Sequence, residues 1–112
     1  MDRDAQQKFH VKVLNTPEAN VLFLSGELDL STAEQFRSVV EPLAGQRTVP
    51  LKLNLRELTY MDSTGIGIFV SVLKKRQPEE SSFAVQEVPA KIRRLFDMTG
   101  LSRYLTIEGG GI

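Results

Sequence analysis

The chain has 112 residues, of which 41% are hydrophobic and 25% charged, and its acidic and basic side chains are equal in number. This length provides one hydrophobic core, and formal neutrality argues against a nucleic-acid-binding surface, which normally carries a basic excess. The lack of cysteine excludes disulfides and thiolate metal sites, and a single histidine excludes a histidine-rich metal cluster.

The first part of the chain predicts two strands and a helix. Residues 9–15 (FHVKVLN) alternate apolar and polar side chains, and residues 21–26 (VLFLSG) form a more apolar strand after a short turn, so the two strands are expected to be antiparallel neighbours. Within residues 26–45, apolar side chains recur at helical spacing. Ser31 and Glu34 match a capping box at the start of this helix, which is expected to stop at its terminal glycine.

The middle of the chain predicts a strand and a deeply packed helix. Residues 50–55 (PLKLNL) place leucines on one side and polar residues on the other, which indicates that one face of the sheet is better covered than the other. Residues 66–73 are apolar nearly all round, and either Asp62 or Ser63 can cap this helix. The basic run at residues 74–76 complements the negative carboxyl end of the helix.

The last part predicts a strand at residues 82–87, a helix that follows Pro89 and stops near Gly100, and an edge strand at residues 104–107. The order ββαβαβα(β) places the chain in the α/β class. We expect a mixed, mostly parallel sheet of four to five strands, with the first strand antiparallel and right-handed crossovers between the parallel strands.

The whole chain, residues 1–112, is expected to form a single domain, with residues 1–7 and 108–112 frayed. Its amino-terminal segment is too polar and acidic for a secretory signal, and no apolar run approaches membrane-spanning length. We therefore expect a cytoplasmic protein without cofactor or metal, and without direct contact to a membrane or nucleic acid.

Two polar loops are expected to meet at the carboxyl edge of the parallel strands, where such folds bind ligands and partners. They are residues 26–31 (GELDLS) and residues 58–65 (LTYMDSTG). Asp29 is either a turn residue or a partner contact, and Met61 is more consistent with the core. Arg93 and Arg94 are expected on a solvated helix face.

The role of Ser63 has four possible interpretations. It is a good helix N-cap residue. As a nucleophile it lacks the G-x-S-x-G motif, and His10 is the only histidine that could activate it. A phosphate-binding loop would need the P-loop lysine, and Asp62 stands where the phosphate would lie. Covalent phosphorylation is compatible with a helix start, so capping and phosphorylation both remain open.

Three segments, GELDLSTA, LRELTYMDSTGIGIFVSVLKK and IRRLFDMTGLSRYL, resemble the signature segments of the STAS-domain anti-sigma factor antagonists. The resemblance is closest to the RsbV-type stress-response branch and runs from about Phe9 to Ile107. It implies the STAS fold, with strands and helices wound as a βα superhelix. It also implies a regulatory protein and not an enzyme.

The resemblance further implies how such a protein acts. The unphosphorylated form binds an anti-sigma factor that is also a GHKL-type serine kinase. This binding releases the sigma factor. Phosphorylation at Ser63 abolishes this binding, and a PP2C-type phosphatase restores it. The residues that the resemblance assigns to partner binding are Gly26, Glu27, Asp29, Asp62, Thr64, Gly65 and Ile66.

Some positions depart from the commoner pattern of the family. Ile66 replaces a leucine, and Leu30 and Ser31 lie where the family varies, so Leu30 and Ile66 are candidates for tuning which kinase fits. The alternative function within the same fold is a small-ligand-binding STAS sensor module that is not phosphorylated.

Overall fold

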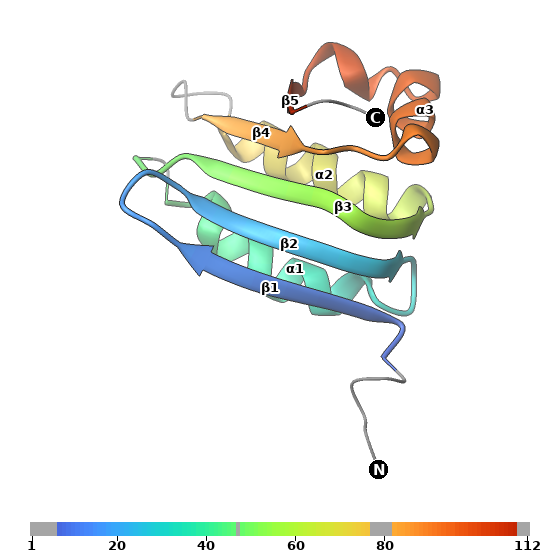
Figure 1. Cartoon of the computed structure of the whole chain (residues 1–112), viewed down its shortest axis with the longest axis horizontal. Coiled ribbons are helices and arrows are strands. Elements are labelled where there is room, and N and C mark those ends of the chain that lie inside the picture. The colour runs from blue at the N-terminus through green and yellow to red at the C-terminus, as the bar shows by residue number, and fades with distance from the viewer. Residues whose placement is uncertain (1–6, 47, 77–81, 110–112) are drawn as a thin grey trace.

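The computed structural model describes residues 7–46, 48–76 and 82–109, and its elements follow the predicted order (Figure 1). The expected edge strand is present and includes Glu108, which was predicted to fray; the other residues predicted to fray lie outside the described residues, except Gln7 and Gly109. The elements are β1 Phe9–Asn15, β2 Asn20–Leu28, α1 Ala33–Ala44, β3 Leu51–Met61, α2 Ser63–Arg76, β4 Phe83–Gln86, α3 Ala90–Met98, a 3₁₀ helix Leu101–Arg103, and β5 Thr106–Glu108.

The sheet has the order β1-β2-β3-β4-β5, with β1 antiparallel to β2 and the other neighbours parallel. Because the spatial order follows the chain order, crossovers of one hand all pass over the same face of the sheet. Figure 1 shows α1 and α2 behind the sheet. The predicted mixed sheet with βα winding is therefore confirmed, as is the prediction that one face is better covered.

A row of four phenylalanines holds the helices to the sheet. It consists of Phe9 in β1, Phe36 in α1, Phe69 in α2 and Phe96 in α3, each at most 2% exposed. Adjacent ring centroids are 6.2, 5.8 and 5.6 Å apart, in edge-to-face or tilted geometry. Such contacts contribute about 0.5–1.5 kcal/mol each beyond the burial of their surface. The row fixes the position of α2 between its two neighbouring helices.

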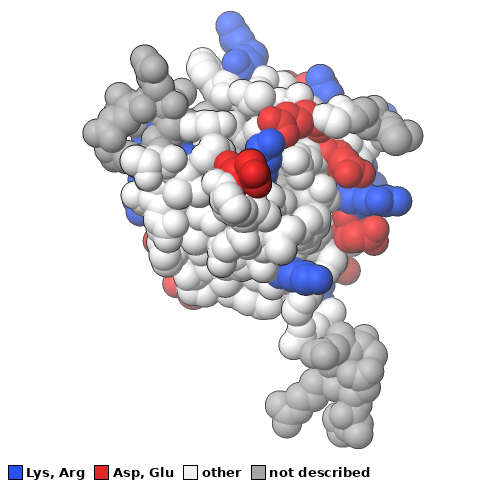
Figure 2. Space-filling view, turned by 60° about the vertical axis from the view of Figure 1, so that its left-hand side comes forward, with Lys and Arg blue, Asp and Glu red and all other residues white. Residues whose placement is uncertain are grey.

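The uncovered face of the sheet carries a row of polar side chains. Asn54 Nδ2 donates to Gln86 Oε1 at 3.3 Å, and Gln86 Nε2 donates to Glu108 Oε1 at 3.3 Å. Lys52 Nζ lies 3.2 Å from the same Glu108 oxygen. Figure 2 shows charged side chains of both signs interspersed on the side of the molecule that it views, with no broad surface of one sign among the described residues there.

The strands that lead to the predicted loops are longer than the sequence indicates. β2 continues to Leu28 and β3 to Met61, where the ladder still pairs Glu27 with Tyr60 and Leu28 with Met61. The predicted loops therefore shrink to residues 29–32 and to Asp62 alone. Pairing between β2 and β3 continues through these positions and makes them part of the sheet. Among the described residues, no helix has the length and apolar character needed to cross a membrane.

Arg76 has a further role beyond the one predicted. It is 1% exposed. Its guanidinium donates to four backbone carbonyls: Ala44 at 3.3 Å, Gln46 at 3.1 Å, Val49 at 2.7 Å and Ser82 at 2.5 Å. Arg76 lies in the last turn of α2, as predicted, but the sequence did not indicate that its hydrogen bonds reach other segments of the chain. Because the planar guanidinium offers five donors, one side chain ties the end of α1 to the segments that precede β3 and β4.

We expect Arg76→Met to lower the free energy of unfolding by about 3 kcal/mol or more, because the apolar stem is retained while the buried carbonyls lose their donor. Urea unfolding measures this change. Lys75→Met is the matched control, since Lys75 is exposed in the same turn, and it should stay within about 0.5 kcal/mol of wild type. Equal stability of the two variants would contradict the role assigned to Arg76.

Candidate functional site

A single residue, Asp62, connects β3 to α2. Its backbone NH donates to the Leu28 carbonyl at 3.2 Å, which extends the pairing with β2 beyond the strand ends. Its Oδ1 accepts from the NH of Thr64 at 2.9 Å and from the NH of Gly65 at 3.3 Å. Asp62 is therefore the cap of α2 and Ser63 is its first residue. The interpretation of Ser63 as the N-cap is wrong, and the alternative that named Asp62 is correct.

Ser63 presents a free hydroxyl at the surface. Its side chain is exposed, and the structure shows no hydrogen bond from it to any of the residues described. The neighbouring Thr64 is half-buried. Of the two hydroxyls in this segment, the Ser63 hydroxyl is thus the more accessible to another protein.

Two glycines in α2 have opposite environments. Gly65 is buried, and a Cβ built on it would lie 2.7 Å from Met61 Cγ and 3.0 Å from Leu28 Cδ2. Gly65 therefore lets the start of α2 pack closely on β2 and β3, and it offers no surface to a partner. Met61 is 5% exposed, which confirms its predicted place in the core. Gly67 is exposed and a Cβ there would meet nothing within 4 Å.

The expectation that α2 is deeply packed holds for one side of the helix, which includes Ile68, Phe69 and Val72, but the other side is exposed. Ser63, Gly67 and Ser71 are exposed along one side of the helix, and Ile66 and Val70 beside them are only partly buried. The helix α2 therefore has a buried side, which contains Phe69, and an exposed stripe of small residues.

The turn between β2 and α1 is built around Asp29. The Ser31 hydroxyl donates to Asp29 Oδ1 at 2.7 Å, and the Ser31 NH donates to the same oxygen at 2.9 Å. Thr32, which precedes α1, donates its hydroxyl to the Glu27 carbonyl at 2.9 Å and accepts from the Asp29 NH at 2.9 Å. The predicted Ser31–Glu34 capping box is therefore wrong, because both hydroxyls bond back to the turn and not forward to the helix.

Lys8 is a site residue that sequence reasoning missed. Its Nζ lies 2.5 Å from Asp29 Oδ2 and 3.9 Å from Glu27 Oε1. The side-chain hydrogen bond from Lys8, followed by that from Ser31, lowers the pKa of Asp29 to about 2. No local signal could have revealed this pair, because only the antiparallel register of β1 and β2 brings the two residues together.

The close approach of Lys8 also explains Gly26. Its φ is +91°, and a Cβ on it would lie 2.1 Å from the Lys8 carbonyl oxygen. The same carbonyl accepts from the NH of Glu27 at 2.9 Å. Gly26 is thus required by the backbone and only partly exposed.

The two turns border one hollow of about 390 Å³, lined by Lys8, Asp29, Leu30, Ser31, Tyr60 and Asp62. Of the residues predicted to bind a partner, Asp29 and Asp62 meet here, and Glu27 joins them through Lys8. Leu30 is 78% exposed and Tyr60 is 45% exposed, so both apolar side chains stand at the rim. Tyr60 was within a predicted loop but not singled out.

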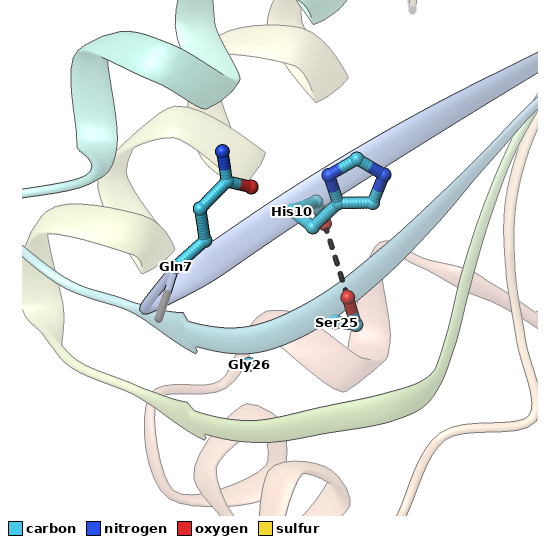
Figure 3. A pocket seen from close by; sticks show the side chains of 4 residues that line it. All are labelled: Gln7, His10, Ser25 and Gly26. Carbon is cyan, nitrogen blue, oxygen red and sulfur yellow. Dashed lines mark hydrogen bonds between the residues drawn. The ribbon is translucent and has the colours of Figure 1, made fainter. Parts of the chain in front are cut away.

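A second hollow, of about 300 Å³, is lined by Gln7, His10, Ser25 and Gly26 (Figure 3). The Ser25 hydroxyl donates to the backbone carbonyl of His10 at 3.5 Å and not to its imidazole. His10 does not line the hollow beside Asp62. Within the described part of the chain, no three acidic or histidine side chains are placed to hold a metal ion.

A family model described as "Mlab, STAS domain" matches residues 11–107. The chain belongs to the STAS domain family. An anti-sigma-B factor antagonist from Staphylococcus epidermidis is 36% identical to this STAS domain over 87 residues, which cover 78% of this chain and 81% of the relative. One from Listeria monocytogenes is 33% identical and covers 78% and 76% of the two chains.

The fold of this STAS domain is also found in solved structures. An anti-sigma factor antagonist from Mycobacterium paratuberculosis superposes with a TM-score of 0.82 at 21% identity, over 91% of this chain and 86% of the other. These comparisons confirm the resemblance to STAS-domain anti-sigma factor antagonists and the fold that it implied.

We expect Gly65→Ala and Gly67→Ala to change the stability of the STAS domain in opposite directions. Gly67→Ala should raise the free energy of unfolding by about 0.5–1 kcal/mol, because alanine favours the helix and meets open space. Gly65→Ala should lower it by about 1 kcal/mol or more, since overpacking against Met61 and Leu28 exceeds the propensity gain. Chemical denaturation measures both, and stabilisation by both variants would contradict the close contact at Gly65.

The pKa of Asp29 provides a test of the Lys8 contact. The carboxyl has a pKa near 3.9 in an unfolded chain and about 2 in the fold, so its stabilising contribution is present above about pH 4 and is lost as the pH falls toward 2. We expect Lys8→Met to raise the pKa of Asp29 toward its ordinary value, as followed by NMR titration of the carboxyl carbon. Lys12→Met, at an exposed position of β1, should leave it unchanged; an unaltered pKa in Lys8→Met would refute the ion pair.

Proposed function

We propose that this STAS domain is an anti-sigma factor antagonist that works as a phosphorylation switch. In the unphosphorylated form it binds an anti-sigma factor with GHKL-type serine kinase activity, so that the sigma factor is released. The names of the Staphylococcus and Listeria relatives support this role. It requires a cytoplasmic location, and a PP2C-type phosphatase to reverse the modification.

The free Ser63 hydroxyl carries the proposal. It is exposed at the first position of α2, and the capping bonds that a serine often makes there are made by Asp62 instead. A kinase can therefore phosphorylate this hydroxyl without breaking the hydrogen bonds that cap the helix. The γ-phosphoryl group passes from ATP to Ser63 Oγ, the hydroxyl loses its proton, and ADP leaves.

A phosphate at Ser63 is compatible with the fold. The start of α2 is the positive end of the helix dipole, which favours an anion at this position even though the amides of Thr64 and Gly65 are already bonded to Asp62. The fold of the modified protein is therefore expected to persist. Phosphorylation should act on the surface and not on stability.

The same phosphate is unfavourable for docking. Asp29 and Asp62 already line the adjacent hollow, and a phosphoserine adds nearly two further negative charges. Lys8 in this hollow is already paired with Asp29, so a partner surface that complements the unmodified site would have to bury the phosphate charges without a further counter-ion. Gly26, Glu27, Thr64 and Ile66 remain proposed members of this docking surface, whereas Gly65 acts indirectly through packing.

We expect Ser63→Asp to abolish binding to the GHKL-type anti-sigma kinase encoded in the same genome while its thermal melt stays close to wild type. Ser63→Ala should bind but gain no phosphate when incubated with kinase and ATP. Ser38→Asp is the matched control, because Ser38 is an exposed serine on α1 that does not line the hollow beside Asp62. It should bind within about twofold of wild type, since exposed charges are screened by salt.

Intact-mass measurement after incubation with the kinase distinguishes this function from its rival. An antagonist gains one phosphate, and peptide mapping places it on Ser63. A ligand-sensing module that is not phosphorylated gains none. Binding of Ser63→Asp as tight as wild type would show that charge at this position does not control docking.

A further inference from the structure

A groove lies at the end of α2 opposite to Ser63. It has a volume of about 280 Å³ and is enclosed by the second half of α2 and the turn that follows α3. Its lining residues are Val70, Leu73, Lys74, Thr99, Gly100, Leu101 and Tyr104. Gly100 has a φ of +78° and no atom within 4 Å of a built Cβ, so the turn leaves the groove open.

The groove has an apolar floor and an exposed apolar rim. Leu101 is 5% exposed and forms part of the core, whereas Tyr104 is 60% exposed. Met98, which precedes the lining residue Thr99 in the chain, is 76% exposed. Large apolar side chains exposed together beside a groove are a common mark of a protein-binding site. The residues that the structure describes leave both side chains largely exposed.

Lys74 supplies a positive charge at this apolar surface. Neither Lys74 nor Arg103, which precedes Tyr104, forms an ion pair with any residue in the described part of the chain. Arg93 in α3, by contrast, is paired with Asp97. An apolar groove beside an unpaired cation is complementary to an apolar side chain with a carboxylate next to it.

The groove and Ser63 face the same direction. At 100° per residue, Val70 and Lys74 lie within about 20° of Ser63 around the axis of α2, whereas Lys75 lies about 120° away. The rise of 1.5 Å per residue separates Ser63 from Lys74 by about 16 Å along the axis. A standard interface buries about 800 Å² on each partner, a patch roughly 30 Å across, so one partner can cover both.

We propose that this groove is the second anchor of the surface that binds the anti-sigma kinase. It accepts an amphipathic segment of the kinase, with an apolar side chain between Val70 and Tyr104 and a carboxylate at Lys74. The inference rests on the proposed function, since it assigns a further part of the same interface. Ser63 and the groove then have separate tasks. Ser63 is the switch, and the groove keeps the kinase bound to this protein while Ser63 is phosphorylated.

The test compares two charge reversals in one helical turn, Lys74→Glu and Lys75→Glu. Both side chains are exposed in the last turn of α2, so both variants lose the same dipole interaction and should melt alike. The probe is the GHKL-type anti-sigma kinase from the same genome. We expect Lys74→Glu to weaken binding at least about tenfold and to raise the kinase KM similarly, with kcat within about twofold because Ser63 is distant.

Lys75→Glu should stay within about twofold of wild type in binding, KM and kcat. Tyr104→Ala, which removes apolar contact without a charge change, should also raise KM and leave kcat unchanged. Equal effects of Lys74→Glu and Lys75→Glu would overturn the groove as an anchor, and so would a wild-type KM in both Lys74→Glu and Tyr104→Ala. Loss of binding in Ser63→Asp would still support the switch in either case. Absence of binding by wild type would overturn both proposals.

Discussion

The candidate site depends on one constraint: Asp62 is the entire connection between β3 and α2. Its NH continues the ladder with β2, and its carboxylate caps α2. Because no further residue intervenes, α2 begins at a fixed point above the sheet. Gly65 then packs against Met61 and Leu28, which sets how closely the helix approaches. Ser63 is left as an exposed first residue of a rigidly placed helix.

The acidic residues around Ser63 have structural roles. Asp62 caps a helix, and Asp29 holds its turn through Lys8 and Ser31. Their charges nevertheless remain at the surface beside Ser63, so the same residues that shape the site also set its potential. A phosphate added there changes the charge of the surface without removing any contact that stabilises the fold. This separation of stability from docking is what a reversible modification requires.

The order of elements and the class of sheet could be predicted because apolar periodicity is a local property, and the family segments located Ser63. Contacts between distant segments could not. Residues 58–61 were predicted to be a loop, and they continue β3 by pairing with β2. Ser31 and Glu34 match a capping box, but the serine bonds to Asp29. The position of Arg76 at the end of α2 suggests an interaction with the dipole of that helix. Its carbonyl acceptors, however, come from segments up to 32 positions away.

The central claim is that phosphorylation at Ser63 changes a docking surface and not the fold. Amide NMR spectra of the unphosphorylated and the Ser63-phosphorylated protein, each alone and with the anti-sigma kinase, test it most directly. We predict shifts confined to the start of α2 and its adjoining hollow on phosphorylation, and kinase-induced changes in the unmodified form only. Shifts throughout the sheet, or equal kinase binding by both forms, would contradict this account.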